Sequence, residues 1–599
     1  MNLFRKKSLH SVSAPEGEIH GGDKLGRHLS VRDLTFFGIA AIIGAGSFSS
    51  MGTACFNGGP GVVLLFIMCG VACGFTALCY AEFAARVPVS GSAYTYAYVS
   101  FGELFAWIIG WALLMEYSIG NIYVAFSWSG YFTNLLEGFG VHLPEWLTIN
   151  YKSVSIASEF VSGCNTYLAS SGRTISEGVF GDWLSSGPIQ KLIQEGKSVE
   201  VLCAEHRGAI QADEKLAVWN SAPMIGNLRI IFDLPAVVIN ALITWLVYVG
   251  VKESRNASNA MVIAKLAVIV LVIIVGATYV DIENWTPWMP NGFGGVMAGV
   301  SAVFFAYIGF DAVSTLAEES KDPQRDLPKG MILSLVICTV IYILLALVLT
   351  GMVNYKQLGV SDPLAEVFAL RGVKWMLFIV SLVAVVAMTS VMLVFQLGQP
   401  RIWMSMSRDG LLPKRFASIH PQYKTPGFST IVTGLVVGIP IFFTDENFIL
   451  DFTSIGTLFA FVLVCGGVLM LPRRERTPGR FNLPFINSKW VASGLLLAIV
   501  GLLLAKVPTY FPGLLDLSGE HAAQNIPQLV FWPLCVVVVI LAHVKQWSLI
   551  PVLGLLSCCY LLTGMAVSNW LWFSVWLVIG LLCYFAYGYR HSKLAPASL

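Results

Sequence analysis

The sequence contains few charged residues. Only 12% of its 599 residues are Asp, Glu, Lys or Arg, whereas soluble globular domains carry about a quarter. Together with a mean hydropathy of +0.72, this scarcity excludes an ordinary soluble enzyme and a disordered chain. No sign of charge predominates, because 37 Lys and Arg face 35 Asp and Glu. The balance excludes a basic nucleic-acid-binding protein, and the composition predicts a protein that crosses a membrane many times.

The sequence also lacks the motifs of several kinds of chemistry. It contains no GxxxxGK[ST] phosphate loop, no HExxH pair and no CxxC pair with zinc-site spacing. We therefore expect no enzymatic activity, no bound metal, no cofactor and no direct use of ATP. A basic start (Arg5, Lys6, Lys7) is not followed by an apolar run for about thirty residues, which argues against a cleaved signal peptide.

Long apolar runs are abundant. A membrane-spanning helix needs about twenty apolar residues, and fourteen stretches meet that requirement. An even number of spans returns the C-terminus to the side on which the chain began. The predicted spans are 35–55, 60–82, 104–132, 234–251, 259–280, 294–318, 330–353, 373–400, 428–443, 450–472, 488–506, 526–544, 548–566 and 570–589.

The distribution of Lys and Arg orients these spans. One set of tails, loops and span ends holds 25 of them and the opposite set holds 11, of which seven lie within 139–232. The positive-inside rule then places both termini in the cytoplasm. We expect the protein to lie in a plasma or inner membrane. The predicted divisions are a tail (1–34), a first unit (35–280), a second unit (294–472), accessory helices (488–589) and a second tail (590–599).

The segment 139–232 is the only large polar insertion in the sequence, and it is predicted to be external. It contains two cysteines, Cys164 and Cys203. In an oxidising compartment these two residues can form a disulfide; the alternative is two free thiols. The polar composition of the insertion indicates a lid or an elaborated loop.

Glycines interrupt two spans at corresponding places. Gly44 and Gly46 fall in the middle of the first span, and Gly309 falls near the middle of the sixth, five spans later. Interrupted helices at matching positions of two five-helix units indicate a transporter built from an inverted repeat. The alternative is that these glycines only allow helices to pack closely.

The interruptions also suggest a chemistry. Unwound backbone inside a membrane leaves N–H and C=O groups that need partners. The N–H groups of the half-helix after Gly46 would attract a carboxylate, and the carbonyls of Phe305, Ala306 and Ile308 would accept from an ammonium group. Together these groups would bind the backbone of an α-amino acid.

Several stretches resemble the amino acid–polyamine–organocation superfamily, and most closely its cationic amino acid transporter family, which includes bacterial amino acid permeases. The resemblance covers most of the first ten spans, is weak over the last four and is absent from 139–232. The fourteen spans also fit this family. The motifs that carry the resemblance are Gly38–Phe48, Tyr80–Phe83, Val87–Tyr94, Gly110-Trp111 with Glu116-Tyr117, Phe304–Glu319, Asp322–Pro328, Gln399–Arg401 and Ser407–Pro413.

The resemblance implies a LeuT-like fold of two intertwined five-helix repeats, with helices 1 and 6 broken and four accessory helices. It implies secondary transport of amino acids by alternating access. The family often has Thr or Ala at position 45 and usually Ile at position 47, so Ser47 makes that wall smaller and more polar. The residues that the resemblance assigns to the substrate are Ile43, Gly44, Ala45, Gly46 and Ser47 for the carboxylate, and Phe305, Ala306 and Ile308 for the amine.

Three charged residues are predicted to lie deep in the membrane, where a charge costs about 2.5–3.5 kcal/mol even on insertion scales. Glu116 either pairs with the cationic head of a lysine, arginine or ornithine substrate or satisfies polar groups between helices. Asp311 either caps the half-helix after Gly309 or contacts the substrate. Phe310 either closes over the substrate or only packs.

The third deep charge is Lys265. The resemblance places it where sodium-coupled relatives of the same fold hold a sodium ion. A buried lysine can lose and regain its proton near neutral pH, so Lys265 is predicted to couple transport to a proton gradient, with Thr389 and Ser390 as hydroxyl partners. The alternative is a lysine whose ammonium snorkels to the membrane surface.

The sequence thus predicts a proton symporter that takes up cationic amino acids. A transporter or exchanger of small neutral amino acids such as alanine is the main alternative, followed by a polyamine transporter and a sensor that retains the fold. The expected partners are an amino acid, a proton and the lipid bilayer, without nucleic acid. An accessory subunit and a homo-oligomer both stay open.

Overall fold

The computed structural model of the chain consists almost entirely of helices, as the sequence predicts. The only strands in the described part are β1 (Met224–Ile225) and β2 (Leu228–Arg229), which pair antiparallel. The structure describes residues 5–7, 29–86, 92–169, Phe180, Leu184, Val199, Leu202, 214–226, 228–250, 255–316, 320–360, 362–471, 481–516, 519–565 and 567–594.

The first group of helices begins with two pieces that are separated by a break. Two helices longer than twenty residues follow, and the insertion separates them from two further apolar helices. The elements are α2 (Val31–Ile42), η2 (Gly46–Ser50), α3 (Met51–Gly58), η3 (Gly59–Gly61), α4 (Val62–Arg86), α5 (Ser92–Ser100), α6 (Glu103–Gly138), α12 (Leu234–Val249) and α13 (Arg255–Ala277).

The second group also begins with a broken helix. Its longest members, α16 and α18, each contain a proline and continue through it as helices. The elements are η5 (Ile282–Trp285), α14 (Gly292–Ala298), α15 (Val300–Phe305), η6 (Phe310–Leu316), α16 (Pro323–Met352), η7 (Tyr355–Gln357), α17 (Pro363–Leu370), α18 (Lys374–Arg408), η8 (Lys414–Ala417), α19 (Gly427–Gly438), η9 (Pro440–Phe442) and α20 (Glu446–Met470).

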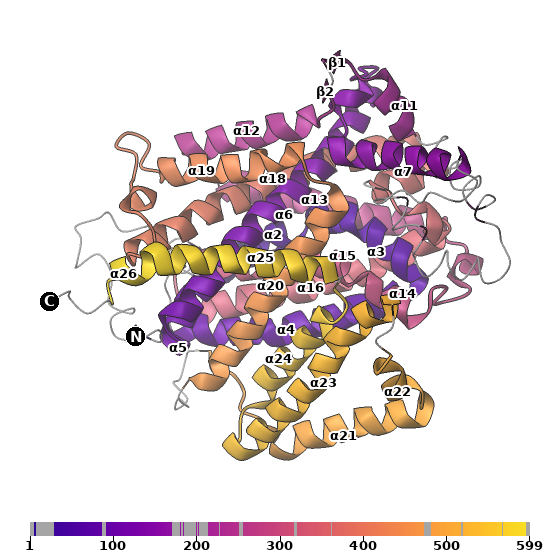
Figure 1. Cartoon of the computed structure of the whole chain (residues 1–599). Helices are drawn as coiled ribbons and strands as arrows, with labels where there is room; N and C mark the ends of the chain where they lie inside the picture. Colours follow the sequence, from indigo (N-terminus) through magenta and orange to yellow (C-terminus); the bar gives the residue numbers. More distant parts are fainter. Residues whose placement is uncertain are drawn as a thin grey trace.

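The last helices and the insertion lie outside these two groups. Figure 1 shows α21 to α24 as a lobe below the main bundle, whereas α7, α11, β1 and β2 lie at its upper right. The elements are η4 (Glu145–Leu147), α7 (Tyr151–Ala169), α11 (Glu214–Ser221), α21 (Ser488–Lys506), α22 (Tyr510–Leu514), α23 (Gly519–Lys545), α24 (Leu549–Leu562), α25 (Val567–Cys583), η10 (Tyr584–Gly588) and α26 (Tyr589–His591).

Eight helices among the described residues are long and apolar enough to cross a membrane. A ninth is counted if α14 and the stretch Val300–Ser314, which are bent by 41°, form one span. Shorter apolar helices occur at 234–249, 261–277, 427–442 and 549–562. Every predicted span contains a helix. The first two predicted spans differ from expectation, because the helical run Gly46–Arg86 joins them through the Gly-Pro-Gly turn η3.

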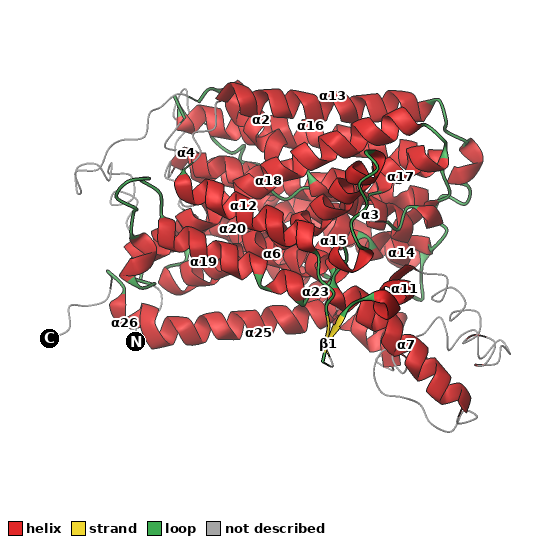
Figure 2. Ribbon diagram, turned by 90° about the horizontal axis from the view of Figure 1, so that it is seen from above, coloured by secondary structure: helices red, strands yellow, loops and turns green. Residues whose placement is uncertain are grey.

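One continuous hydrophobic core runs through the first two groups of helices, and the two groups are interleaved. α2 and α13 of the first group lie beside α16 of the second (Figure 2), and α6 packs against α18 and α20. In the most apolar stretch of α6, 89% of the residues are buried, compared with 11% in the most apolar stretch of α21. α6 is therefore a central helix and α21 a peripheral one. The lobe of α21, α23 and α24 has a small core of its own, made by Ala492, Val538, Val539, Ala542 and Val552.

Candidate functional site: a cavity between two broken helices

The first break lies between α2 and η2. α2 ends at Ile42 because the next residue, Ile43, is extended, with ψ of 101°. The carbonyl of Gly44 accepts from the N–H groups of Ser47 (3.0 Å) and Phe48 (3.1 Å), so the chain turns here. Within the described ranges, the N–H of Gly44 donates to no backbone carbonyl. The break falls where the two glycines predict it.

The second break lies between α15 and η6. The N–H groups of Tyr307 and Ile308 turn back onto the carbonyls of Phe304 (2.9 Å) and Phe305 (3.1 Å), which ends the α-helical pattern. Gly309 then has φ of +110°, a backbone conformation that side chains disfavour. The glycine therefore permits the change of direction before η6, and this break also falls where the sequence predicts it.

The two breaks lie against each other. A Cβ atom added to Gly46 would stand 2.5 Å from the Cα of Ala306, and one added to Gly309 would stand 3.0 Å from the backbone of Ala41. The Ser50 hydroxyl in η2 donates to the carbonyl of Ala302 in α15 (2.9 Å). The glycines thus allow the close packing that the sequence left as the alternative, and they also interrupt the helices.

A small cavity lies between the breaks. Its volume of about 10 Å³ is about what one water molecule requires, so this conformation holds the cavity nearly closed. The side chains that line it are apolar, and none is charged. The lining residues are Ala41, Ile42, Gly44, Ala45, Gly46, Val124, Phe305, Ile308, Val391 and Phe395.

Five of the predicted substrate residues line this cavity: Gly44, Ala45, Gly46, Phe305 and Ile308. The other five lie around it. Ile43 and Ala306 lie in the two breaks, and the Ser47 hydroxyl donates to Gly44 O. Glu116 lies in α6, closer to the start of the helix than the cavity-lining Val124. The Phe310 ring packs against the rings of Tyr80 and Phe461, with ring centroids 5.9 and 5.1 Å apart, and does not line the cavity.

The sequence did not indicate the opposite wall of the cavity. Val124 comes from α6, and Val391 and Phe395 come from α18. All three are apolar residues in long apolar helices, so no local signal distinguishes them from lipid-facing neighbours. Ala41 and Ile42 do belong to the motif Gly38–Phe48, but the expectation for that motif began at Ile43. Only the packing of α6 and α18 beside both breaks identifies these residues.

Lys265 reaches the first break. Its side chain is fully buried in α13, and its Nζ donates to the carbonyls of Ala40 and Ile43, both at 3.1 Å. These are carbonyls at the end of α2, which the break leaves without helical partners. The lysine therefore does not snorkel to the membrane surface, and its amine is held against the residues that border the cavity.

The two predicted partners of Lys265 make other hydrogen bonds. The Thr389 hydroxyl donates to Val385 O (2.7 Å) and accepts from Trp128 Nε1 (2.9 Å). The Ser390 hydroxyl donates to Ala387 O (2.8 Å). Both donors are used within α18, which leaves only hydroxyl lone pairs for an ammonium group.

Glu116 and Asp311 are both buried in the core, with at most 1% of their surface exposed. No hydrogen bond from the described residues reaches Glu116 Oε1 or the hydroxyls of Tyr80 and Tyr117. The Asp311 carboxylate faces the backbone of Gly309, Asp311 and Ala312. Asp311 is the second residue of η6 rather than the residue before it. Buried polar atoms without partners need an explanation, and a bound cation or water would supply one.

The remaining expectations concern cysteines and metals. The predicted pair Cys164–Cys203 is not testable here, since Cys203 lies outside the described residues. Cys164 itself packs with Phe160, Phe180 and Leu184 in a small core of the insertion. In the described part of the chain, no group of three or more His, Cys, Asp or Glu side chains is arranged to hold a metal ion.

Comparison with known proteins identifies the kind of molecule that carries this cavity. Residues 29–541 match a family model described as amino acid permease, and residues 549–592 match one for its C-terminus. The chain is 35% identical to the branched-chain amino acid permease BcaP and 33% identical to a methylthioribose transporter, both from Bacillus subtilis (strain 168). Each of these alignments covers 99% of both chains.

A third relative is the vacuolar cationic amino acid transporter 2 of Arabidopsis thaliana, 30% identical over 100% of this chain and 94% of its own. These matches confirm the resemblance that the motifs indicated. The matched proteins are transporters and not enzymes.

Proposed function

We propose, because the chain belongs to the amino acid permease family, that it carries L-amino acids across a membrane by alternating access. The observation that supports this most directly is the cavity between the two breaks. The N–H groups near Gly44 suit an α-carboxylate, and the carbonyls around Ala306 suit an α-amine. The cavity is too small for an amino acid in this conformation, so transport requires that its walls separate.

The proposed architecture has fourteen spans, of which the first ten form a 5+5 inverted repeat and the last four are accessory. The helix found in each predicted span and the two breaks five spans apart support it. We place both termini in the cytoplasm and the protein in a plasma or inner membrane. The distribution of Lys and Arg supports this orientation, and Figure 2 shows both termini at the same end of the bundle.

The cavity favours a neutral aliphatic substrate, a class that includes the small neutral amino acids that the sequence ranked second. Val124, Ile308, Val391 and Phe395 supply apolar side chains, and no charged group lines the wall. A cationic side chain would lose its hydration there without a partner, which is costly. The name of BcaP, a branched-chain amino acid permease, agrees with such a substrate.

A cationic substrate is the second candidate, and the unpaired carboxylate oxygen of Glu116 favours it. Glu116 lies eight residues before Val124, about 12 Å along α6. A lysine or arginine side chain would have to extend past the cavity to reach that carboxylate. The names of the plant and human relatives that match here include cationic amino acid transporters.

We further propose that transport is coupled to protons through Lys265. The charged form of the lysine would hold the end of α2 through the carbonyls of Ala40 and Ile43. Loss of the proton would weaken both hydrogen bonds, because a charge-assisted hydrogen bond is about twice as strong as a neutral one. Opening of the first break would thus be linked to the protonation state of this side chain.

Purified protein in liposomes tests these proposals. We expect an inward proton gradient to drive accumulation of labelled leucine, isoleucine, valine or alanine, and Lys265→Ala to abolish accumulation while leaving exchange. Lys506→Ala, at the exposed end of α21, is the matched control. Accumulation of lysine or arginine that Glu116→Gln abolishes would favour the second candidate. If no amino acid accumulates, the proposal fails and a sensor becomes the better explanation.

A further inference from the structure

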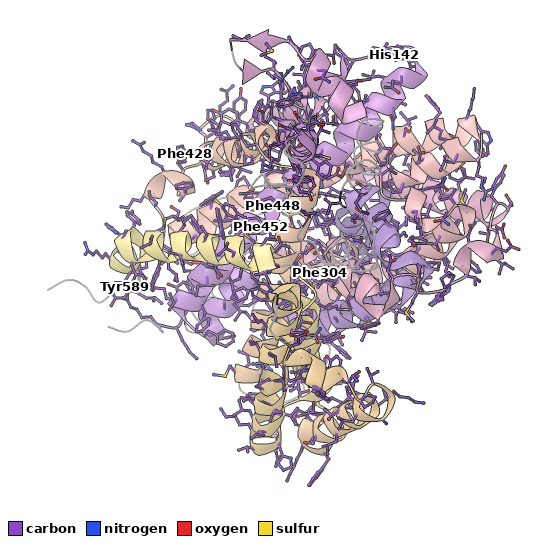
Figure 3. All side chains as sticks on the ribbon, turned by 45° about the vertical axis from the view of Figure 1, so that its right-hand side comes forward. His142, Phe304, Phe428, Phe448, Phe452 and Tyr589 are labelled. Atoms are coloured by element: carbon purple, nitrogen blue, oxygen red, sulfur yellow. The ribbon has the colours of Figure 1, made fainter. Side chains whose placement is uncertain are left out.

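Glu446 contacts η2, the helical segment that follows the first break. It is the first residue of α20 and is partly exposed. Its Oε1 accepts from the hydroxyls of Ser49 (3.2 Å) and Ser127 (3.5 Å). Ser49 belongs to η2 and Ser127 to α6, so one carboxylate connects three elements. In the side-chain view, Tyr589 marks the terminal end, and Phe448 and Phe452, near the start of α20, lie well away from it (Figure 3).

The contacts of Glu446 continue to the cavity wall. The Ser49 hydroxyl also pairs with the Tyr123 hydroxyl (3.2 Å), and the Tyr123 ring meets the Phe305 ring edge to face at 4.7 Å. Phe305 lines the cavity, and so does Gly46, three residues before Ser49 in η2. Glu446 is therefore linked directly to the first broken helix and, through Ser49 and Tyr123, to Phe305 of the second.

The groups that face Glu446 are acidic or neutral. They are Tyr123 and Tyr131 from α6, Asp362 before α17 and Asp233 before α12, besides the two serines. Among the described residues, no Lys or Arg nitrogen lies within 4 Å of its carboxylate. Burial of the carboxylate raises the pKa of Glu446 to about 7.

We propose that Glu446 is a proton-binding gate residue, whose protonation from the solution on its own side holds the cavity closed on that side. Closure surrounds the carboxylate with α6 and η2, and a proton removes the charge that this enclosure would otherwise bury. Opening returns the carboxylate to water, where it loses its proton. This inference rests on the proposed transport function.

The direction of the pH effect follows from linkage. The conformation in which a group has the higher pKa is favoured as the pH falls. With a pKa of about 7 in the closed form and a usual value near 4.3 in the open form, closure becomes about tenfold more favourable from pH 8 to pH 6. The proton returns to the solution from which it came, so it is not transported.

That difference separates Glu446 from Lys265 in an experiment. In wild-type liposomes, we expect the half-saturating substrate concentration to depend on the pH of the solution facing Glu446, with up to tenfold change between pH 6 and pH 8. Glu446→Gln should flatten this dependence while the number of protons moved per substrate stays unchanged. Glu366→Gln, in α17 and partly exposed, is the matched control and should behave like wild type.

Hydrogen–deuterium exchange of residues 46–58 provides a readout that does not require transport. After correction for the intrinsic pH effect, exchange should be slower at pH 6 than at pH 8 in wild type and nearly equal in Glu446→Gln. Ser49→Ala, which keeps the carboxylate, should reduce the difference and serves if the glutamine variant does not fold. A pH dependence that survives in Glu446→Gln, or a changed proton stoichiometry, would overturn the inference.

Discussion

The carboxylates at the two ends of the helix bundle have different partners. At the end that carries both termini, Glu103 is fully buried. It accepts from the hydroxyls of Tyr98 (3.1 Å), Tyr584 (2.9 Å) and Ser592, and a guanidinium nitrogen of Arg5 lies 4.0 Å away. The N-terminal segment, α6 and the C-terminal segment therefore meet at one carboxylate, which has a cation beside it.

At the opposite end, the carboxylates have neutral donors. Glu446 accepts from two serine hydroxyls, and Asp362 accepts from the side-chain amide of Asn134. Asp233 accepts from the hydroxyl of Ser129 (2.6 Å) and from the N–H of Ala236 (2.9 Å). None of the ion pairs among the described residues lies at this end.

The difference has a physical consequence. A buried carboxylate beside a guanidinium is costly to separate from it, so the contact holds one arrangement of the chain. A buried carboxylate that has only neutral donors gains a proton more easily, so its contacts depend on pH. The terminal end is thus suited to fixing the structure, and the opposite end to changing it during transport.

The largest effect should follow from Glu103→Ala. The substitution leaves Arg5 without its carboxylate in a buried position and removes the acceptor for three hydroxyls. Removing one partner of a buried ion pair costs about 3–5 kcal/mol. We expect a large fall in the melting temperature, measured by tryptophan fluorescence in detergent. A Glu103→Ala melting temperature equal to that of Glu446→Gln at pH 8 would contradict the comparison.

A smaller effect should follow from Lys7→Ala at the same end. The Lys7 ammonium lies 2.6 Å from Asp409, but its side chain is 25% exposed, and Asp409 keeps the hydrogen bond from Tyr94 (2.7 Å). Exposed ion pairs contribute about 1 kcal/mol or less. The melting temperature should therefore fall only slightly. Lys6→Ala, whose side chain is exposed, should leave it unchanged, and a loss as large as that of Glu103→Ala would be inconsistent with this reasoning.

The smallest effect should be the contribution of Glu446 to the pH dependence of stability. Burial raises the pKa of Glu446 and of Asp233 to about 7, above their values in the unfolded chain. The folded protein then binds more protons between about pH 4 and pH 7, so these groups favour folding more as the pH falls through that window. From pH 8 to pH 6 the melting temperature of wild type should gain more than that of Glu446→Gln. Identical gains would show that this carboxylate is not enclosed.

Local sequence was sufficient for several features of the site. Gly44, Gly46 and Gly309 marked both breaks, since glycine has a low helix propensity and a wide conformational range. The depth of Lys265 in an apolar run marked it as a buried charge. These predictions needed only the neighbours of each residue along the chain.

Other features had no local signal. Val124, Val391 and Phe395 resemble any apolar residue of a long helix, and only the approach of α6 and α18 makes them the cavity wall. Glu446 stood just before the predicted span 450–472, where a charge is ordinary. Its contacts with Ser49 and Ser127 bridge about 400 and 320 residues of chain, and such separations cannot be read from sequence periodicity.

The sequence by itself determined that this protein lies in a membrane, where its helices break and that three charges lie deep in it, because composition, glycine and hydropathy act over short distances. The tertiary structure decided which groups face the cavity and which cation accompanies which carboxylate. Those pairings depend on helices that are distant in sequence and packed against one another. The same kind of residue, a glutamate at a helix start, thus fixes one end of the molecule and is proposed to respond to pH at the other.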